Sequence, residues 1–438
     1  MRVLFKNGGL ELRSVGSVID LTALDILSPG SPGYEASPKS RLVVRCHSVS
    51  NVVQVMAYAA ETGQRMVPRG GGHCFVDRCP VDGIVVDLSG MDRIAVDEND
   101  VATIGAGARL GAVYAALHGC GRTIPAGCGD TVGIAGLTLG GGIGLLGRQY
   151  GLTCDRLVGA QVVLADRSVV ECDEHRDSDL FWALRGAGGG QFGIVTELRF
   201  ATVPEPSVCR IDGRWSEPGK LIEGRWTESS KLIEAWQDWA PDAPDGMTVN
   251  LHVQAGHARL FGVSTLPPAQ TRELLREFTA RAGVLYAIDI RLDVPYSMVK
   301  PTFSAIGPAA TSRGRSEFFA RAMSECTVGE LLKGLTGNRR LAFTAMGGAY
   351  NRVAEAATAF AHRGERFLLE QVGDPGDPWV DEAWHQAHEE GSGRVYPNFP
   401  DLALEDPAQA YHAGNFPRLA ALKKSYDPHR VFDFPQAL

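Results

Sequence analysis

The sequence predicts an α+β protein built from two lobes. Its 438 residues are more than one hydrophobic core usually holds, so two domains are expected. Between residues 41 and 68, an apolar stretch, a segment with helical spacing and a second apolar stretch follow one another, as in a βαβ unit. Between residues 245 and 372, short strands alternate with two helices, which predicts an antiparallel sheet covered by helices on one face.

The composition narrows the class of partner. Hydrophobic residues make up 44% of the chain and charged residues 21%, as in an ordinary globular protein. The net charge of −8 and the lack of a long Lys/Arg cluster argue against nucleic acid and against an anionic membrane surface. We therefore expect a small-molecule substrate, and a chain that is a monomer or a homodimer.

The cysteines and the N-terminus indicate the compartment. Nine cysteines are scattered through the chain, an odd number without the paired C-x-x-C spacing of zinc sites. The N-terminus has no apolar stretch of signal-peptide length, and no run approaches the ~20 apolar residues of a spanning helix. We expect free thiols, no metal site and a cytoplasmic protein.

The first lobe begins with the βαβ unit. A helix is predicted over residues 48–63, with Ser50 as its N-cap and Gly63 as its stop, between strands at 41–46 and 66–68. Further strands are predicted at 84–88, 94–97, 101–107, within 155–165 and up to 202, with helices at 110–117 and 178–185.

Two glycine-rich stretches mark the expected ligand site. Residues 69–73 read R-G-G-G-H, and residues 132–144 read V-G-I-A-G-L-T-L-G-G-G-I-G. Consecutive glycines permit positive φ and let backbone N–H groups approach a ligand, which is how a pyrophosphate is usually held. Because the first stretch follows a βαβ unit at a strand end, a nucleotide cofactor is the expected occupant.

A second pattern in the same region suggests NAD but lacks the right context. Gly142, Gly144 and Gly147 satisfy G-x-G-x-x-G, and Asp166 stands where a ribose-binding acid would be expected. A Rossmann unit needs a full helix after the glycines, whereas residues 148–155 allow at most two turns and contain Gly151. This argues against a nicotinamide cofactor.

Taken together, the motifs resemble those of a known family. R-G-G-G-H at 69–73, D-G-I-V-V-D-L-S at 82–89, the 132–144 stretch and D-L-F-W-A-L-R-G-A-G-G-G-Q-F-G-I-V-T at 179–196 are similar to the berberine-bridge-enzyme-like branch of the vanillyl-alcohol-oxidase superfamily. The likeness spans roughly residues 40–204 and 341–438. It implies a two-lobed FAD-binding domain of the vanillyl-alcohol-oxidase type and a separate substrate cap.

The resemblance also implies cofactor contacts. The histidine closing R-x-G-G-H carries FAD through the flavin 8α-methyl in that family, which assigns covalent attachment to His73. The other positions implied by the motifs are Arg69, Gly70, Gly71, Gly72, Val132, Gly133, Gly136, Gly140, Gly141, Gly142, Gly144, Ile194 and Asn398. Doubly linked relatives carry a cysteine three residues before the valine of the V-G loop. Here that position is Gly129, and Cys128 is displaced by one residue, about 3.8 Å, so we expect a single attachment.

The rest of the chain divides at a change of composition after residue 204. We expect the first part of the FAD-binding domain at 1–204, the cap at 205–390 and a C-terminal segment at 391–438 that returns to the FAD-binding domain. Within the cap, strands are predicted at 248–253, 259–264, 341–345 and 366–371, and helices at 268–282 and 355–361. Residues 213–223 are nearly repeated by 224–234, which we interpret as a short tandem duplication.

The expected chemistry is alcohol oxidation. A flavin accepts a hydride at N5, so the protein must hold a C–H bond there and take the proton from the adjoining hydroxyl. Tyr396, in the segment Y-P-N-F-P-D, is the predicted proton acceptor, provided that its pKa is lowered from about 10. Otherwise the base is a carboxylate such as Glu370. Strand alternation lets only one of Glu370 and Gln371 face the substrate.

The predicted function is an FAD-dependent oxidase of a sugar or secondary-metabolite hydroxyl, with oxygen as acceptor and hydrogen peroxide as product. Three alternatives stay open. These are a flavin dehydrogenase or oxidative-cyclisation enzyme with another acceptor, a nicotinamide-dependent reductase on the same fold, and a flavin-binding protein without turnover. No motif in the cap identifies the substrate.

Overall fold

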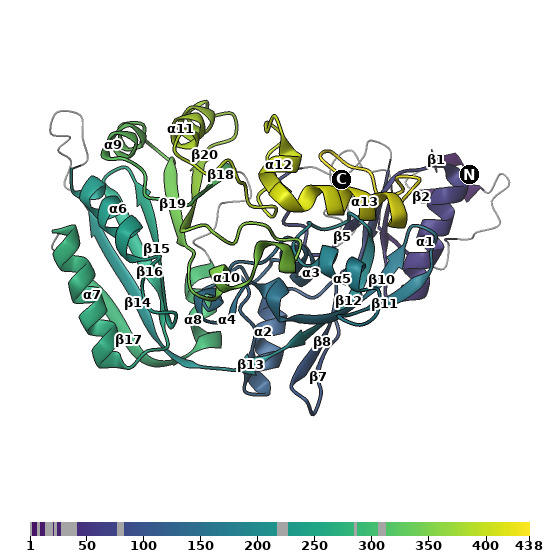
Figure 1. The fold of residues 1–438 in the computed structure, drawn as a ribbon. Coiled ribbons are helices and arrows are strands. Elements are labelled where there is room, and N and C mark those ends of the chain that lie inside the picture. Colours follow the sequence, from purple (N-terminus) through teal and green to yellow (C-terminus); the bar gives the residue numbers. More distant parts are fainter. Residues whose placement is uncertain are drawn as a thin grey trace.

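The computed structural model describes residues 2–6, 9–13, 21, 24–27, 42–76, 83–216, 227–283, 287–304 and 312–438. The first lobe, coloured purple to blue-teal in Figure 1, lies beside the teal-to-green cap, and the yellow C-terminal segment returns to the first lobe. The predicted α+β class and two-lobed arrangement are confirmed. Both chain ends lie in the first lobe.

The predicted βαβ unit is present in a four-stranded sheet of order β3-β4-β6-β5. Its strands are β3 (Asp25–Leu27), β4 (Leu42–Arg45), β5 (Met66–Arg69) and β6 (Ile84–Asp87), of which the last three run parallel. Helix α1 (Val49–Thr62) joins β4 to β5 and ends at Gly63, whose φ is 65°. The predicted N-cap was wrong by two residues: Ser48 accepts the Asn51 N–H, and Ser50 lies in the first turn.

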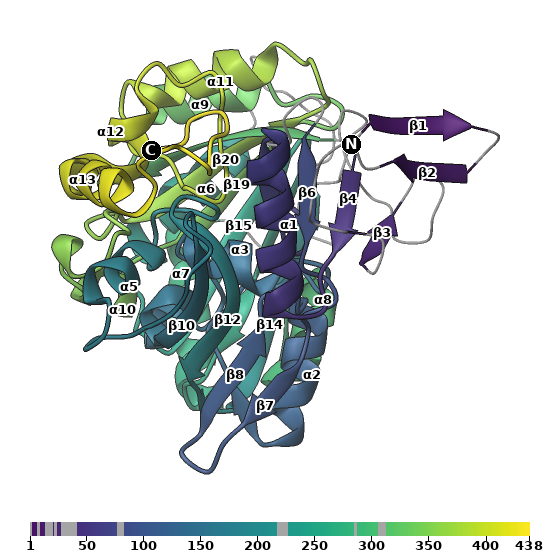
Figure 2. The same ribbon diagram turned by 90° about the vertical axis from the view of Figure 1, so that its right-hand side faces the viewer.

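The second sheet of the first lobe is antiparallel, with the order β11-β10-β12-β8-β7. Its strands are β7 (Ile94–Val96), β8 (Val101–Gly105), β10 (Leu157–Leu164), β11 (Val169–Cys172) and β12 (Gly193–Ala201). Helix α1 contacts β6 of one sheet and β10 of the other, so a single hydrophobic core joins the two sheets. Figure 2 shows α1 between them, and the hairpin of β1 (Arg2–Lys6) and β2 (Gly9–Arg13) extending away.

Short elements complete this lobe. They are α2 (Leu110–Gly119), β9 (Arg122–Thr123), α3 (Ile134–Leu139), α4 (Gly147–Tyr150), a 3-10 turn at Thr153–Arg156, α5 (Ser178–Leu184) and β13 (Val203–Pro204). Because α4 has only four residues, the G-x-G-x-x-G pattern at 142–147 has no Rossmann helix after it.

The cap is built on a seven-stranded antiparallel sheet of order β17-β14-β16-β15-β19-β20-β18. The strands are β14 (Ser207–Ser216), β15 (Met247–Gln254), β16 (His257–Ser264), β17 (Ala287–Pro295), β18 (Arg313–Phe319), β19 (Arg340–Ala345) and β20 (Phe367–Gly373). Sequence prediction found four of these strands and missed β14, β17 and β18. In β14 and β17, apolar residues alternate with arginine and aspartate, so neither segment forms the apolar run that marked the other strands, although both keep the strand period.

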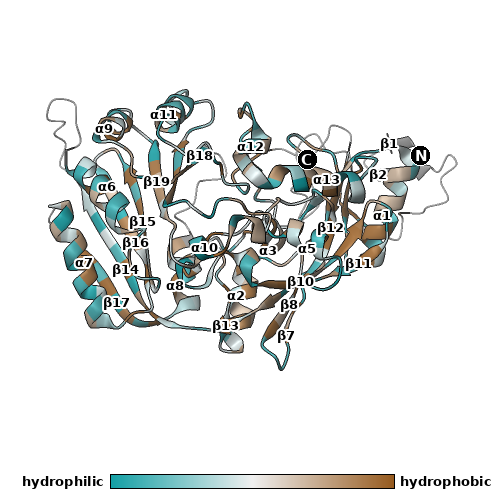
Figure 3. Cartoon of the chain, viewed as in Figure 1, coloured by the Kyte–Doolittle hydropathy of each residue, from teal (hydrophilic) through white to brown (hydrophobic). Residues whose placement is uncertain are grey.

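Helices cover one face of the cap sheet, as predicted. They are α6 (Thr227–Trp239), α7 (Pro268–Ala282), α9 (Glu325–Lys333) and α11 (Trp379–His388), and their apolar sides share a core with the sheet. Figure 3 shows hydrophilic and hydrophobic stretches alternating along α7, as expected of a helix that is half buried. Helix α8 (Tyr296–Ser304) contacts β14, β17 and α2, on the side of the sheet that faces the first lobe.

The helix predicted over 355–361 was wrong. The chain forms α10 (Ala349–Arg352) and then only a 3-10 turn at Glu355–Ala357. Thr358 is extended, with φ −141° and ψ 169°, and this conformation stops helix growth. Most of the tandem repeat at 213–234 cannot be described, because residues 217–226 lie outside the described residues.

The C-terminal segment closes on the first lobe through α12 (Pro407–His412), a 3-10 turn at Ala413–Asn415 and α13 (Phe416–Tyr426). The buried Lys423 ammonium on α13 donates to the Gln191 carbonyl at 2.6 Å and to the Phe432 carbonyl at 2.8 Å. It also pairs with Asp427 at 2.8 Å. We propose the domain limits 1–204, 205–390 and 391–438, because the cap sheet begins with β14 just after β13 ends at Pro204.

Two further properties belong to the described residues as a whole. The eight cysteines among them are free thiols. No helix in this part of the chain is long and apolar enough to cross a membrane.

One buried cation joins the lobes. Arg148 on α4 is 1% exposed, and its guanidinium donates to the cap carbonyls of Met247 at 2.9 Å and Pro241 at 2.7 Å, and to those of Ala243 and Met346. Four carbonyls that would otherwise be buried without donors therefore depend on one side chain.

Replacing Arg148 by Met should lower the free energy of unfolding by about 3 kcal/mol, because the carbonyls lose their donors while the buried volume is kept. The control is Arg352→Met, which removes an arginine that is 58% exposed and paired with Asp245, and should cost under about 1 kcal/mol. Urea denaturation measures both values. Equal losses in the two variants would contradict this account of the interface.

Candidate active site

A cavity of about 420 Å³ lies where the first lobe, the cap and the C-terminal segment meet. The first lobe supplies the end of β5, the 69–75 loop, α3 with its flanking loops, and the start of β12. The cap supplies residues of β15, β16, β19 and β20, and the C-terminal segment supplies residues 396–400 and Phe434. This volume is in the range of small-molecule and cofactor sites.

The two glycine-rich loops meet backbone to backbone at this cavity. A Cβ placed on Gly71 would lie 2.1 Å from the Gly133 nitrogen, and a Cβ on Gly133 would lie 2.3 Å from the Gly71 nitrogen. No side chain fits at either position, so both residues must be glycine for the loops to approach this closely. Gly70, Gly71 and Gly72 line the cavity, and their N–H groups make no hydrogen bond with any described residue. Such N–H groups suit an anionic ligand.

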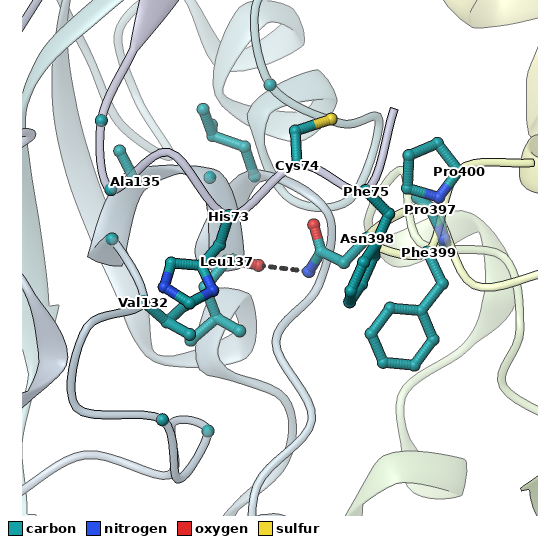
Figure 4. Close-up of a pocket in the computed structure, with 18 of the residues that line it drawn as sticks. His73, Cys74, Phe75, Val132, Ala135, Leu137, Pro397, Asn398, Phe399 and Pro400 are labelled. Atoms are coloured by element: carbon teal, nitrogen blue, oxygen red, sulfur yellow. Dashed lines mark hydrogen bonds between the residues drawn. The ribbon is translucent and has the colours of Figure 1, made fainter. Parts of the chain in front are cut away.

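His73 ends the first loop and lines the same cavity. Its Nε2 is 2.8 Å from the hydroxyl of Thr131, the residue just before the second glycine-rich stretch, and this contact fixes the orientation of the ring. Figure 4 shows the imidazole beside Val132, on the opposite side of the cavity from the Phe75 and Phe399 rings. These two rings pack edge to face, with centroids 5.2 Å apart.

Tyr396 is held by hydrogen-bond donors at the back of the cavity. Its oxygen accepts the N–H groups of Gly142 at 3.0 Å and Ile143 at 3.1 Å, and the Asn398 amide at 2.9 Å. The ring is 3% exposed and packs among apolar side chains from both lobes. Burial raises the pKa of Tyr396 to about 12, although the three donors act to lower it.

Asn398 connects the C-terminal segment to the second glycine-rich loop. It lines the cavity, and its amide also donates to the Leu137 carbonyl at 2.8 Å, as drawn in Figure 4. A Cβ on Gly140 would lie 2.1 Å from the Asn398 Oδ1, so this glycine is needed for the contact.

Strand alternation separates Glu370 from Gln371. Leu368 and Glu370 on β20 line the cavity, whereas Gln371 is fully buried on the opposite, helix-covered face with Leu369. Gln371 is therefore not placed to contact a substrate. Burial raises the pKa of Glu370 to about 7, against the lowering influence of Arg340.

Most, but not all, of the predicted cofactor positions line the cavity. Those that do are Arg69, Gly70, Gly71, Gly72, His73, Val132, Gly133, Gly136, Gly144 and Asn398. Ile194 does not, because it lies in the core on the face of β12 opposite Gly193 and Val195. Gly140, Gly141 and Gly142 form a turn behind the cavity wall, where they pack against Asn398, Phe360 and Thr153.

Cys128 also lines the cavity, and the residues just before it contact the buried cation of Lys300. The Lys300 ammonium donates to the carbonyls of Ala126 at 2.5 Å and Gly127 at 2.7 Å, directly before Cys128. Burial lowers the pKa of Lys300 to about 8 and raises the pKa of the Cys128 thiol, although Lys300 acts to lower the latter. Cys128 is thus a protonated thiol at neutral pH.

Sequence reasoning missed the cap side of the cavity. Asn250, Phe261, Thr344 and Leu368 line it from four neighbouring strands, in one cross-strand row. Each strand alternates, so the set of inward positions could have been inferred, but not which of the two faces turns inward.

Comparisons with known proteins agree with this geometry. The family model of an FAD binding domain matches residues 40–173, and the model described as berberine and berberine like matches residues 395–438. The FAD-linked oxidoreductase YgaK of Bacillus subtilis (strain 168) is 32% identical over 425 residues, which is 91% of this chain and 90% of that protein. The chain belongs to the berberine-bridge-enzyme-like FAD-linked oxidoreductases.

Two further relatives show how far the likeness extends. The glucooligosaccharide oxidase of Sarocladium strictum is 27% identical over 475 residues, covering 96% of this chain and 90% of that protein. The solved structure of Physcomitrella patens BBE-like 1 has a TM-score of 0.85 at 26% identity, covering 95% and 96% of the two chains. This berberine-bridge-enzyme-like chain is an FAD-linked oxidoreductase, and the glycine loops that line a cavity together with His73 fit that cofactor.

The contact between the loops can be tested with glycine variants. Gly71→Ala should lose most of its bound FAD, because the added carbon must push residue 71 away from Gly133. Gly119→Ala is the control, since a Cβ at the end of α2 meets nothing within 4 Å and should leave the FAD content unchanged. Flavin absorbance per mole of purified protein gives the result. Full FAD content in Gly71→Ala would show that the loops can separate without losing the site.

Proposed function

We propose that the enzyme oxidises an alcohol, transferring a hydride to an FAD that is attached to His73, with oxygen as the final acceptor. The observation that carries this proposal is the position of Glu370. It is a carboxylate with a pKa of about 7, on the cap wall of the cavity that contains His73. The likeness to a glucooligosaccharide oxidase supports a hydroxyl as the group that reacts.

The balance of the reaction defines what the residues must do. When bound, the flavin supplies an acceptor for a hydride from the substrate carbon. The alcohol loses that hydride and the hydroxyl proton, and becomes an aldehyde or ketone. Oxygen takes up two electrons and two protons and becomes hydrogen peroxide. The chain must therefore bind the alcohol, orient its C–H bond and accept one proton.

Glu370 is the proposed proton acceptor. A base works best when its pKa is near the operating pH, and burial brings this carboxyl to about 7. Tyr396, the acceptor expected from the sequence, has a pKa of about 12, so roughly one molecule in 10⁵ would carry the phenolate at pH 7. We assign Tyr396 a positioning role instead, since its oxygen holds the Gly142 turn and Asn398.

The cap residues beside Glu370 orient the alcohol. The Asn250 Oδ1 accepts the Ala345 N–H at 3.2 Å, which fixes that amide at the cavity wall next to Thr344. Phe261 and Leu368 supply apolar surface on either side of this polar pair. A hydroxyl-bearing carbon against this wall is shielded from water, which strengthens the interaction between its hydroxyl and Glu370.

Attachment at His73 predicts a flavin that survives denaturation. Wild-type protein precipitated in acid should keep its yellow colour, and His73→Ala should release all of it, because the bond to the flavin is lost. His257→Ala, which removes an exposed histidine on the cap, should behave like wild type.

The same samples test whether the attachment is single. A map of flavin-bearing peptides should show the His73 peptide alone, since the Cys128 thiol is protonated and therefore a poor nucleophile. Release of flavin from the wild type would refute covalent attachment. A Cys128 adduct would refute single attachment.

The choice of base predicts different effects for two near-isosteric variants. Glu370→Gln should slow anaerobic flavin reduction by an alcohol about 10²- to 10⁴-fold, because the amide cannot accept the proton. Tyr396→Phe should slow it less than tenfold while lowering stability, because two backbone N–H groups lose their acceptor. In the wild type, the apparent second-order rate should rise with pH up to about 7 and then level off.

Stopped-flow absorbance on a panel of sugars and aromatic alcohols, followed by admission of air, measures these rates. The opposite ranking of the two variants would return the role of base to Tyr396. Flavin that is reduced but reoxidises slowly in air, without peroxide, would indicate a dehydrogenase with another acceptor.

A further inference from the structure

A row of five residues, three of them charged, crosses the cap sheet on the face that turns toward the cavity. Its members, paired strand by strand, are Arg214 on β14, Arg259 on β16, His252 on β15, Ala342 on β19 and Glu370 on β20. On each of the last four of these strands, the residue of this row is two positions from the residue of the cavity-lining row, which consists of Phe261, Asn250, Thr344 and Leu368. Two residues along a strand is about 7 Å. The proposed base Glu370 therefore lies in the same cross-strand row as Arg214 and Arg259.

The arginines on this face outnumber the carboxylates. Asp212 alone accepts from three arginines, with Arg259 at 2.9 Å, Arg210 at 2.7 Å and Arg214 at 3.3 Å. The paired positions of the face hold five arginines and three carboxylates: Arg210, Arg214, Arg259, Arg291 and Arg340, with Asp212, Asp289 and Glu370. Among the paired positions of this face, the arginines therefore exceed the carboxylates by two.

Arg259 connects this charge to the cavity wall. Its guanidinium lies over the Phe261 ring, 5.8 Å from the centroid, and Phe261 lines the cavity. Its side chain is 23% exposed, and it lies just beyond the residues that line the cavity. The His252 ring meets the same Phe261 ring edge to face at 4.9 Å. Burial, Arg340 and Arg259 hold the pKa of His252 well below its usual range, so it is a neutral group in a positive surrounding.

We infer that this face binds an anionic oxygen group, such as a carboxylate, at the far end of the substrate alcohol. The inference rests on the proposed function, because it takes Glu370 as the point where the alcohol reacts. Three strand spacings separate Arg259 from Glu370, about 14 Å between their Cα atoms. A substrate that joins them carries roughly two rings between its hydroxyl and its acid. Phe261 and Leu368, on the same strands as Arg259 and Glu370, supply apolar surface for a ring at each end, and Asn250 and Thr344 lie on the two strands between them.

One substitution removes the proposed anion contact without leaving a carboxylate unpaired. Arg259→Gln leaves Asp212 paired with Arg210 and Arg214, so no carboxylate is left without a cation. The matched control is Arg276→Gln on α7, which makes the same change of charge at a side chain that is 71% exposed on the helix side of the sheet. Flavin content and the urea midpoint show whether each variant is folded.

Binding is measured with probes that cannot react, so that it does not depend on turnover. The probes are 4′-methylbiphenyl-4-carboxylate and the corresponding carboxamide, titrated into the flavin-loaded enzyme and followed by flavin absorbance. The wild type should bind the acid at least tenfold more tightly than the amide, with a preference that falls as salt is added. Arg259→Gln should lose about 10- to 100-fold in affinity for the acid and little for the amide. Arg276→Gln should match the wild type.

Equal affinity of the wild type for acid and amide would overturn the inference. So would an equal loss of acid affinity in Arg276→Gln and Arg259→Gln, because the acid would then respond to the net charge of the protein and not to a site at Arg259. The reactive analogue 4′-(hydroxymethyl)biphenyl-4-carboxylate separates this proposal from the previous one. Acid binding that depends on Arg259, with no alcohol on the panel reducing the flavin, would support the anion site and refute the oxidase. Flavin reduction by neutral alcohols, without acid binding that depends on Arg259, would support the oxidase and refute the anion site.

Discussion

The backbone contact between Gly71 and Gly133 determines where everything else in the site can lie. Gly71 follows β5, whose position is set by parallel pairing with β6, and Gly133 precedes α3. Because neither residue has a side chain, the two loops touch, and this brings His73 within hydrogen-bond distance of Thr131. The proposed point of flavin attachment, His73, is thus located by a contact between two loops about sixty residues apart in sequence.

The rest of the cavity depends on the assembly of three distant segments. Tyr396 and Asn398, near the end of the chain, hold the turn at Gly142 and the carbonyl of Leu137. Arg148 holds the cap loops against the first lobe. Each contact is between a side chain and the backbone, so it specifies position without requiring a particular partner side chain. A cofactor that spans these segments stabilises the whole arrangement, since it binds the folded chain and not the unfolded one.

Local signals in the sequence were enough for parts of the first lobe and for α7. The βαβ unit, the Gly63 stop and the glycine loops each depend on residues close together in the chain. Three questions about the site could not be answered from local signals. Gly140 to Gly142 share a motif with true cavity residues but serve packing, Ile194 is on the wrong face of β12, and Glu370 could not be separated from Gln371. In each case the sequence showed the motif or the alternation of side chains along the strand. Which of these side chains face the cavity depends on packing against segments that are distant in sequence.

The electrostatics of the cap wall tie the proposed base to the proposed anion site. Burial raises the pKa of Glu370, and Arg340 opposes that shift, so the value of about 7 is a balance between the two. An acid group of the substrate that binds among the arginines adds a negative charge to the same face and offsets part of the influence of Arg340. The pKa of Glu370 then rises further, because a nearby negative charge disfavours the carboxylate. A bound acid group would thus raise the pH above which Glu370 is deprotonated, which couples recognition of the far end of the substrate to the protonation state of the proposed base.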